Sequence, residues 1–284
     1  GHLSGAAFDV FTEEPAKKNI LFKAPNFIAT PHLGASTKEA QENVAVQIAE
    51  QMSNYLISGA ISNALNFPNV TAEEAPILKP YIKLSYLLGS FLGQVTSEGI
   101  KSVKLELEGK ASYIKDEPIL ANALFGVLQP SSVIVNSVNA LKIASGRGIT
   151  VSSTKHERRC DYETLLTLSI IHENGERIIS GTLIGGYMPR IVNIQGIPIE
   201  SGFPRNALYL RNYDKPGLIG QLGNMLGKRE VNIASFHLGR RKKGGEAIAL
   251  IEVDEKINNN LLEEIKNLPQ VVRVNSIYFK LNFN

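Results

Sequence analysis

A glutamate and a histidine near the start of the sequence have residue types and a spacing that suit proton transfer. Glu14 follows the apolar segment 6–11, and His32 follows the apolar segment 26–30. If these segments are neighbouring parallel strands, both side chains lie at the carboxyl edge of the sheet, where open α/β sheets bind ligands. A carboxylate beside an imidazole fixes its tautomer and raises its pKa, so the pair could move a proton near neutral pH. A hydrogen-bonded structural histidine is the alternative.

The residues after His32 predict an open loop followed by a helix. Gly34 and Ala35 add little side-chain bulk, so a flat ligand could lie against the backbone beside the imidazole. Ser36 and Glu39 form the S-x-x-E pattern of a capping box, which predicts that a helix begins here.

Two motifs in this region resemble those of a known enzyme family. Residues 1–15 read G-x-x-x-G-A-A-F-D-V-F-T-E-E-P, and residues 30–37 read T-P-H-L-G-A-S-T. The pair resembles the catalytic region of the D-3-phosphoglycerate dehydrogenases, in the D-2-hydroxyacid dehydrogenase family. The resemblance implies that His32 is the general acid/base, that Glu14 pairs with it, and that NAD lies beside Asp9, His32 and the backbone of Gly34 and Ala35.

The same resemblance implies the reaction, the oxidation of 3-phosphoglycerate to 3-phosphohydroxypyruvate in L-serine biosynthesis. The 284 residues contain no G-x-G-x-x-G fingerprint for a dinucleotide pyrophosphate. They also lack the carboxylate-clamping arginine, which the family places further upstream. We therefore expect the chain alone not to turn over substrate. The alternative is an effector-binding regulatory module without dehydrogenase activity, in which the first sixty or so residues are a vestige.

Hydrophobic patterning predicts a multidomain protein of α/β and α+β class. Residues 1–66 are expected to be the incomplete end of a Rossmann-type catalytic region, and an Asn- and Pro-containing linker follows. Residues 67–204 are similar in place and size to an inserted allosteric-substrate-binding domain of long bacterial enzymes of this family. Residues 205–284 have a βαββαβ pattern, the ferredoxin-like unit, and resemble an ACT domain.

Three polar residues of the ACT-like region are candidates for binding an amino-acid effector. Asn212 and Asp214 precede a predicted helix, and Asn232 begins the following strand. Free N–H groups at a helix N-terminus attract a carboxylate, and Asp214 suits an ammonium group. The resemblance implies that the effector is L-serine. The alternative is that Asp214 caps the helix and Asn232 turns the chain.

A basic cluster in the middle region is a candidate anion site, with Lys155, Arg158 and Arg159 as its members. In an extended segment Lys155 and Arg159 share one face and Arg158 lies on the other. Arginine presents a planar fork to oxyanions, and the inserted domain of the family carries a basic anion site. The alternative is a solvated strand edge whose charges block unwanted pairing.

The composition excludes several other functions. The net charge is only +3, and no aromatic residues interleave the basic ones, so we expect no nucleic-acid partner. We also expect no metal site. No run of about 18 apolar residues exists, which excludes a membrane partner, and the lone Cys160 fits a reducing cytoplasm. ACT domains commonly pair side by side, so the resemblance implies a homo-oligomer, either a dimer or a tetramer.

Overall fold

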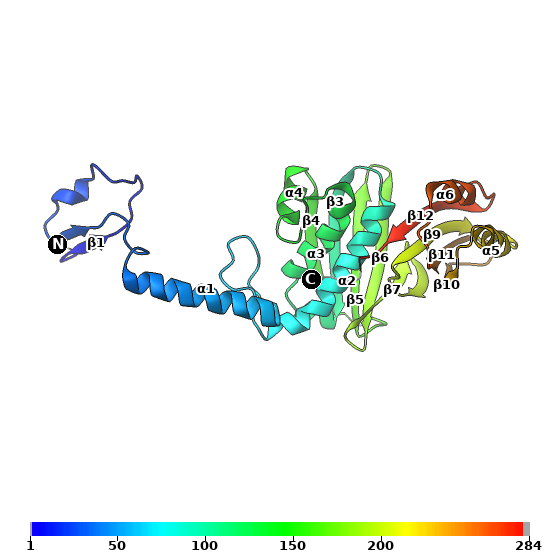
Figure 1. The fold of residues 1–284 in the computed structure, drawn as a ribbon, viewed down its shortest axis with the longest axis horizontal. Coiled ribbons are helices and arrows are strands. Elements are labelled where there is room, and N and C mark those ends of the chain that lie inside the picture. The colour runs from blue at the N-terminus through cyan, green and yellow to red at the C-terminus, as the bar shows by residue number, and fades with distance from the viewer. Residues whose placement is uncertain (1, 159, 281–284) are drawn as a thin grey trace. The chain divides into compact units, whose positions relative to one another are not determined.

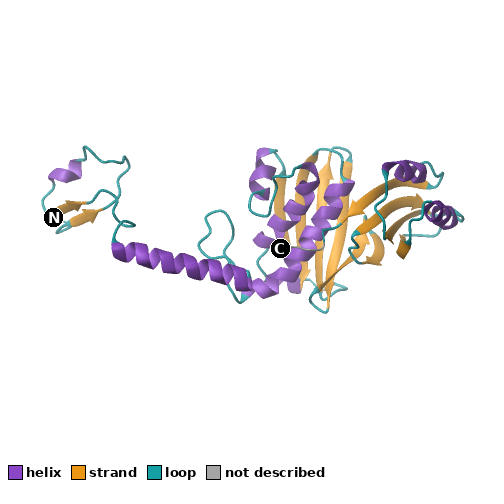
Figure 2. Cartoon of the chain, in the orientation of Figure 1, coloured by secondary structure: helices purple, strands orange, loops and turns teal. Residues whose placement is uncertain are grey.

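The computed structural model describes residues 2–158 and 160–280, which form two compact units. The first unit comprises residues up to 62 together with 70–72, and the second comprises 63–69 and 73 onward. Both units contain helices and strands (Figures 1 and 2), which confirms the predicted mixed architecture of α/β and α+β parts. Among the described residues, no helix is long and apolar enough to cross a membrane.

The first unit is a short parallel β-pair followed by a long helix. Strand β1 (Ala6–Phe8) pairs with β2 (Phe27–Ala29), and the 3₁₀ helix η1 (Ile20–Lys23) lies between them in sequence. Four aromatic rings pack edge to face or tilted beneath the pair, from Phe8, Phe11, Phe22 and Phe27. This aromatic cluster holds the two strand ends together.

Helix α1 (Lys38–Ser58) begins one residue later than a capping box at Ser36 requires. The Ser36 N–H donates to the Leu33 carbonyl in a turn, and Thr37 is the N-cap, its hydroxyl accepting from the Ala40 N–H at 3.1 Å. The predicted S-x-x-E capping box is therefore wrong, because Ser36 is still occupied by the preceding turn.

The second unit begins with a larger sheet that is covered on one face by helices (Figure 1). Its strand order is β4-β3-β5-β6-β7-β8, in which β3 and β4 are parallel and the other neighbours antiparallel. Its strands are β3 (Ile100–Gly109), β4 (Thr150–His156), β5 (Thr164–His172), β6 (Gly175–Ile184), β7 (Met188–Ile194) and β8 (Ile197–Ser201). Its helices are α2 (Glu74–Val95), η2 (Lys110–Tyr113), α3 (Glu117–Leu128), η3 (Gln129–Ser131) and α4 (Ala140–Gly146).

Helix α2 is longer than its sequence pattern predicted. We expected it to begin after Pro80, but it begins at Glu74 and Pro80 lies inside it. Its apolar face is fully buried at Leu84, Leu88 and Phe91, and burying each such side chain contributes about 1.5–3 kcal/mol. Packing of this face against the sheet and α3 offsets the backbone hydrogen bond that proline cannot donate.

A smaller sheet and two helices complete the unit and confirm the βαββαβ prediction. The elements are β9 (Asn206–Tyr213), α5 (Leu218–Lys228), β10 (Ile233–Arg240), β11 (Glu246–Val253), α6 (Asn259–Lys266) and β12 (Val271–Tyr278). The antiparallel sheet has the order β10-β11-β9-β12. Leu208, Leu222, Ile251 and Ile265 are central to a core shared by one face of this sheet and its helices.

The C-terminal turn of α2 anchors the smaller sheet to the larger one. The Gln94 side chain donates to the Tyr278 carbonyl at 3.0 Å and accepts from the Tyr278 N–H at 2.8 Å. The Phe91 and Tyr209 rings meet edge to face at 5.0 Å, and Arg273 donates to the Val95 carbonyl at the end of the helix. Strand β12 is therefore tied to a helix end by polar and aromatic contacts.

Candidate active site

Parallel pairing of β1 and β2 brings the predicted acid and base into contact. Glu14 follows β1 and His32 follows β2, and Oε2 of Glu14 lies 2.7 Å from Nδ1 of His32. The other Glu14 oxygen accepts from the Phe11 N–H at 3.0 Å, which fixes the carboxylate. With Nδ1 engaged in this way, Nε2 is the ring nitrogen available for a substrate proton.

Asp9 holds the loop that carries the histidine. Its carboxylate accepts from the Thr30 hydroxyl at 2.6 Å, the Leu33 N–H at 2.6 Å and the Gly34 N–H at 2.8 Å. Its carbonyl accepts from the His32 N–H at 2.9 Å, and His32 has a positive φ of 57°. These bonds stabilise a left-handed backbone that a non-glycine residue rarely adopts. Sequence reasoning placed Asp9 beside a cofactor and missed this clamp.

The polar contacts shift three pKa values. The hydrogen bond and the charge of Glu14 raise the pKa of His32 above its usual value, and the hydrogen bond from His32 lowers the pKa of Glu14. The hydrogen bond from the Thr30 hydroxyl, followed by that from the Leu33 N–H, lowers the pKa of Asp9. Both carboxylates therefore stay ionised over the range in which His32 exchanges its proton.

A cavity of about 460 Å³ adjoins these groups, and Asp9, Phe22, Thr30 and His32 are among the residues that line it. Gly34 borders Asp9 closely, because a Cβ at this position would lie 3.2 Å from Oδ2 of the carboxylate. Ala35 follows Gly34 in the same loop, and its small side chain leaves the backbone accessible. The site thus combines an imidazole, a braced carboxylate and an apolar wall.

We expect the Glu14→Gln substitution to lower the pKa of His32 toward its ordinary value of about 6.5, since an amide carries no charge to stabilise imidazolium. NMR titration of the His32 ring proton in both chains measures the two midpoints. Glu13→Gln is the matched control, because Glu13 makes no hydrogen bond to His32 among the described residues. A His32 midpoint that stays unchanged in Glu14→Gln would contradict the coupling.

Asn212 and Asp214 lie close together at one end of the smaller sheet. Asn212 is buried, and its Nδ2 donates to the Tyr213 carbonyl at 3.0 Å, whereas its Oδ1 has no hydrogen-bond partner. Asp214 accepts from Arg240 at 2.7 Å and from the Gly244 N–H at 3.0 Å. The alternative that Asp214 caps α5 is wrong, because the N-cap of this helix is Gly217 and has no side-chain cap.

Asn232 lies at the opposite end of the same sheet. Asn212 pairs with Ala247 near the start of β11, whereas Ile233 pairs with Val253 at its end. Because a strand rises about 3.3 Å per residue, the two ends are roughly 20 Å apart. One chain therefore does not bring Asn232 to the ligand that Asn212 and Asp214 would bind.

The basic cluster of the larger sheet is paired with carboxylates. Lys155, on the edge strand β4, lies 2.8 Å from Asp116, and the Arg158 Nε donates to Glu108 at 3.0 Å. Arg159 lies outside the described residues. Since both described members already have carboxylate partners, the cluster is not a prepared anion site, and the edge-strand alternative fits it better. The partners come from distant parts of the sequence, which is why spacing did not reveal them.

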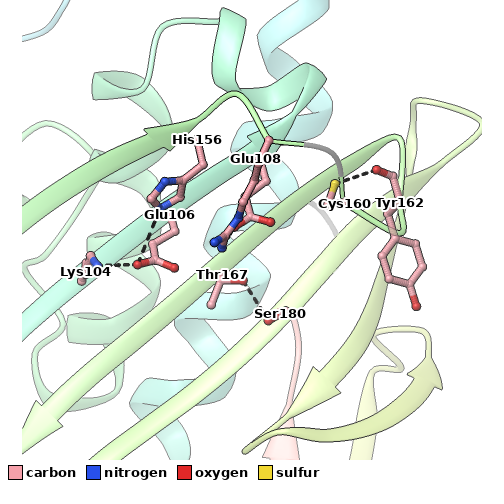
Figure 3. A network of polar contacts seen from close by, with 9 residues as sticks. Lys104, Glu106, Glu108, His156, Cys160, Tyr162, Thr167 and Ser180 are labelled. Carbon is pink, nitrogen blue, oxygen red and sulfur yellow. Dashed lines mark hydrogen bonds and ion pairs between the residues drawn. The ribbon is translucent and has the colours of Figure 1, made fainter.

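Figure 3 shows the polar network around this cluster. The ligand atoms of Glu106, Glu108 and His156 lie within 4.8 Å of one another, a spacing that could hold a metal ion. Lys104 binds Glu106, however, and Arg158 binds Glu108. A cation already neutralises each carboxylate, so this arrangement works as a network of ion pairs across β3 and β4.

Three family models match successive parts of the chain. Residues 1–34 match the NAD binding domain of D-isomer specific 2-hydroxyacid dehydrogenases, and residues 207–270 match the ACT domain. Residues 77–195 match the intervening domain of D-3-phosphoglycerate dehydrogenase. In chain order, the matched parts are thus similar to a 2-hydroxyacid dehydrogenase NAD binding domain, to the intervening domain of D-3-phosphoglycerate dehydrogenase and to an ACT domain.

Similarity to curated proteins extends along nearly the whole chain. It is 35% identical over 278 residues to the D-3-phosphoglycerate dehydrogenase of Bacillus subtilis, covering 98% of this chain and 53% of that protein. The enzyme of the same name from Synechocystis is 38% identical over 265 residues, 93% of this chain and 48% of the relative. The enzyme of the same name from Methanocaldococcus jannaschii is 35% identical over 275 residues, which cover 95% of this chain and 52% of the relative. The chain spans about half the length of these relatives, and its predicted resemblance to D-3-phosphoglycerate dehydrogenases is confirmed.

Proposed function

We propose that this chain is part of an NAD-dependent D-3-phosphoglycerate dehydrogenase, which oxidises 3-phosphoglycerate to 3-phosphohydroxypyruvate in L-serine biosynthesis. The observation that carries the proposal is the 2.7 Å contact between Glu14 and His32, inside the segment that matches an NAD-binding domain. We also propose three domains, 1–66, 67–204 and 205–284, and a cytoplasmic location, which the single Cys160 fits.

In this proposal His32 removes the proton from the C2 hydroxyl of the substrate. Nε2 accepts the proton, and Glu14 stabilises the imidazolium that forms through its bond to Nδ1. The Asp9 bonds keep the ring at a fixed position while it changes charge. NAD, when bound, supplies the acceptor for the C2 hydride. The small residues Gly34 and Ala35 fit one side of a flat ring, whereas these 284 residues contain no glycine loop for the pyrophosphate.

L-serine is the proposed effector of the ACT domain. Asn212 offers a buried oxygen without a partner among the described residues. Asp214 already pairs with Arg240, but its bonds to Arg240 and to the Gly244 N–H both go to Oδ2, so Oδ1 is the oxygen offered to an ammonium group. Since Asn232 lies at the far end of the sheet, a second copy of the chain would have to supply it. The proposed effector site is thus shared between copies, which fits a homo-oligomer.

A chimaeric enzyme tests the proposal. The matched half of the Bacillus subtilis relative is replaced by this chain, and NADH formation from 3-phosphoglycerate is measured. We expect activity in the chimaera, none in the isolated 284-residue chain, and a decrease in kcat of about a hundredfold or more in His32→Gln. Asp214→Asn is expected to keep the basal activity and to weaken the response to L-serine.

The possible results of this experiment distinguish the dehydrogenase proposal from its alternatives. A folded chimaera that oxidises no substrate but binds L-serine would favour the effector-binding module without dehydrogenase activity. Turnover by the isolated chain would contradict the expectation that its cofactor site is incomplete. Full activity in His32→Gln would remove the assigned proton acceptor.

A further inference from the structure

Thr30, directly after β2, joins the ends of the two short strands by two hydrogen bonds. Its N–H donates to the carbonyl of Phe8, the last residue of β1, at 3.0 Å. Its hydroxyl donates to Oδ1 of Asp9, the next residue along the chain, at 2.6 Å. Any residue except proline could form the first bond, but only a side chain with a donor forms the second. The hydroxyl is therefore what threonine adds at this position.

The Asp9 carboxylate is the group that the Thr30 hydroxyl holds. Its Oδ1 accepts from the Thr30 hydroxyl and from the Leu33 N–H, both at 2.6 Å. Its Oδ2 accepts from the Gly34 N–H at 2.8 Å. Two of these three donors are backbone groups of the loop after His32, so a side-chain substitution removes only the bond from Thr30. Without that bond the carboxylate is free to turn about its Cβ–Cγ axis, and the anchor of the loop turns with it.

The anchored loop carries His32 in a backbone conformation that needs support. The φ of His32 is 57°, in the left-handed region that a residue with a Cβ rarely adopts. Its N–H donates to the Asp9 carbonyl at 2.9 Å, so Asp9 binds the loop before, at and after the histidine. Because a rotation of the backbone here swings the imidazole, the 2.7 Å contact between Nδ1 of His32 and Glu14 depends on these bonds.

We propose that Thr30 is a positioning residue of the candidate active site. Its hydroxyl orients the Asp9 carboxylate, and Asp9 holds the loop in the conformation that directs the His32 imidazole at Glu14. This inference rests on the proposed function, in which His32 accepts the substrate proton. The alternative is that Thr30 only stabilises the strand pair, in which case its loss lowers the stability of the chain and leaves the proton affinity of His32 unchanged.

NMR titration of the full 284-residue chain tests the positioning role without any turnover. Thr30→Val keeps the branched shape and removes the donor, whereas Thr30→Ser keeps the donor. In Thr30→Val we expect the Asp9 midpoint to rise, because the bond from Thr30 is the main cause of its lowered pKa. We expect the His32 midpoint to fall toward about 6.5, because the two charged groups that face the ring, Glu14 and Asp9, hold it less closely. Thr30→Ser should keep both midpoints.

Kinetics of the chimaeric enzyme test the consequence for the reaction. We expect Thr30→Val to lower kcat about tenfold or more and to leave KM for 3-phosphoglycerate within about twofold, because the base is misplaced while the substrate contacts stay. The acid limb of the kcat profile should move to lower pH together with the His32 midpoint, since the base acts in its deprotonated form. Thr30→Ser should recover most of kcat. Circular dichroism checks that both variants are folded.

The outcomes separate this inference from the proposed function. Unchanged Asp9 and His32 midpoints in a folded Thr30→Val chain would overturn the positioning role, even if the chimaera is active. An equal loss of kcat in Thr30→Val and Thr30→Ser would also overturn it, because the hydroxyl would then not be the group that matters. If the parent chimaera oxidises no substrate while the two midpoints shift as expected, the positioning of His32 by Thr30 is supported and the proposed reaction is contradicted.

Discussion

Replacing Gly89 with alanine is expected to lower the free energy of unfolding by about 3 kcal/mol or more, one of the largest effects in this chain. A Cβ at Gly89 would lie 2.1 Å from the Ala123 carbonyl oxygen and 3.1 Å from the Val127 backbone nitrogen. Both atoms belong to the backbone of α3, so no side-chain rotation relieves the overlap. The two helices would have to separate along their contact.

The contact is extensive, because three glycines interlock across it. Gly89 and Gly93 are four residues apart and share one face of α2. A Cβ at Gly93 would lie 2.3 Å from the Val127 carbonyl oxygen, and one at Gly126 would lie 2.3 Å from the Tyr86 carbonyl oxygen. Moving α3 away from Gly89 therefore also opens the contacts at the other two glycines.

Urea unfolding followed by circular dichroism measures the loss. Gly220→Ala in α5 is the matched control, because nothing lies within 4 Å of its Cβ position. This control is expected to stabilise the protein by about 0.5–1 kcal/mol, since alanine favours a helix. An unfolding midpoint for Gly89→Ala at or above that of the parent chain would show that the helices can separate without cost.

Local patterns in the sequence were sufficient to predict the helices and strands that have strong hydrophobic periodicity. Alternation and turn residues predicted the βαββαβ order, and Asn174-Gly175 marked the turn between β5 and β6. The start of α2 was wrong because Pro80 was taken as a helix boundary, although burial of the apolar face outweighs its local cost. The four-residue spacing of Gly89 and Gly93 was visible in the sequence and was missed.

The candidate sites were harder to predict, because they are formed by contacts between segments that are far apart in the sequence. Each strand beside the catalytic pair is only three residues long, so the contact of Glu14 with His32 came from motif resemblance more than from periodicity. The pairing of Arg158 with Glu108 joins β3 to the end of β4, and no spacing rule reveals it. The separation of Asn232 from Asn212 follows from strand register, which the sequence alone does not specify.

Loss of the Glu98 carboxylate is the second large effect. Glu98 lies 2.7 Å from Arg177, whose side chain is only 10% exposed, near the end of α2 that holds the smaller sheet. Burial raises the pKa of Glu98, but the hydrogen bond and the charge of Arg177 lower it by more than burial raises it. The resulting pKa is about 2. We expect Glu98→Gln to lower the free energy of unfolding by about 3 kcal/mol at pH 7, because it leaves Arg177 buried without a counterion.

The pH dependence and a matched control variant make the expectation for Glu98→Gln specific. The folded-state pKa of Glu98 lies below the usual 4.5, so the stabilisation is present above pH 4.5 and is lost as the pH falls toward about 2. The stability difference between Glu98→Gln and the parent chain should therefore shrink over this range. Glu263→Gln removes an exposed partner of Lys266 and should cost less than about 1 kcal/mol.

Adding Arg177→Met to Glu98→Gln should recover much of the lost stability, since the penalty comes from the unpaired buried charge and not from the missing bond. If the double variant is no more stable than Glu98→Gln alone, the attraction between the pair outweighs its desolvation. The junction between the two sheets would then depend on that ion pair directly, in addition to the Gln94 and Phe91 contacts of α2.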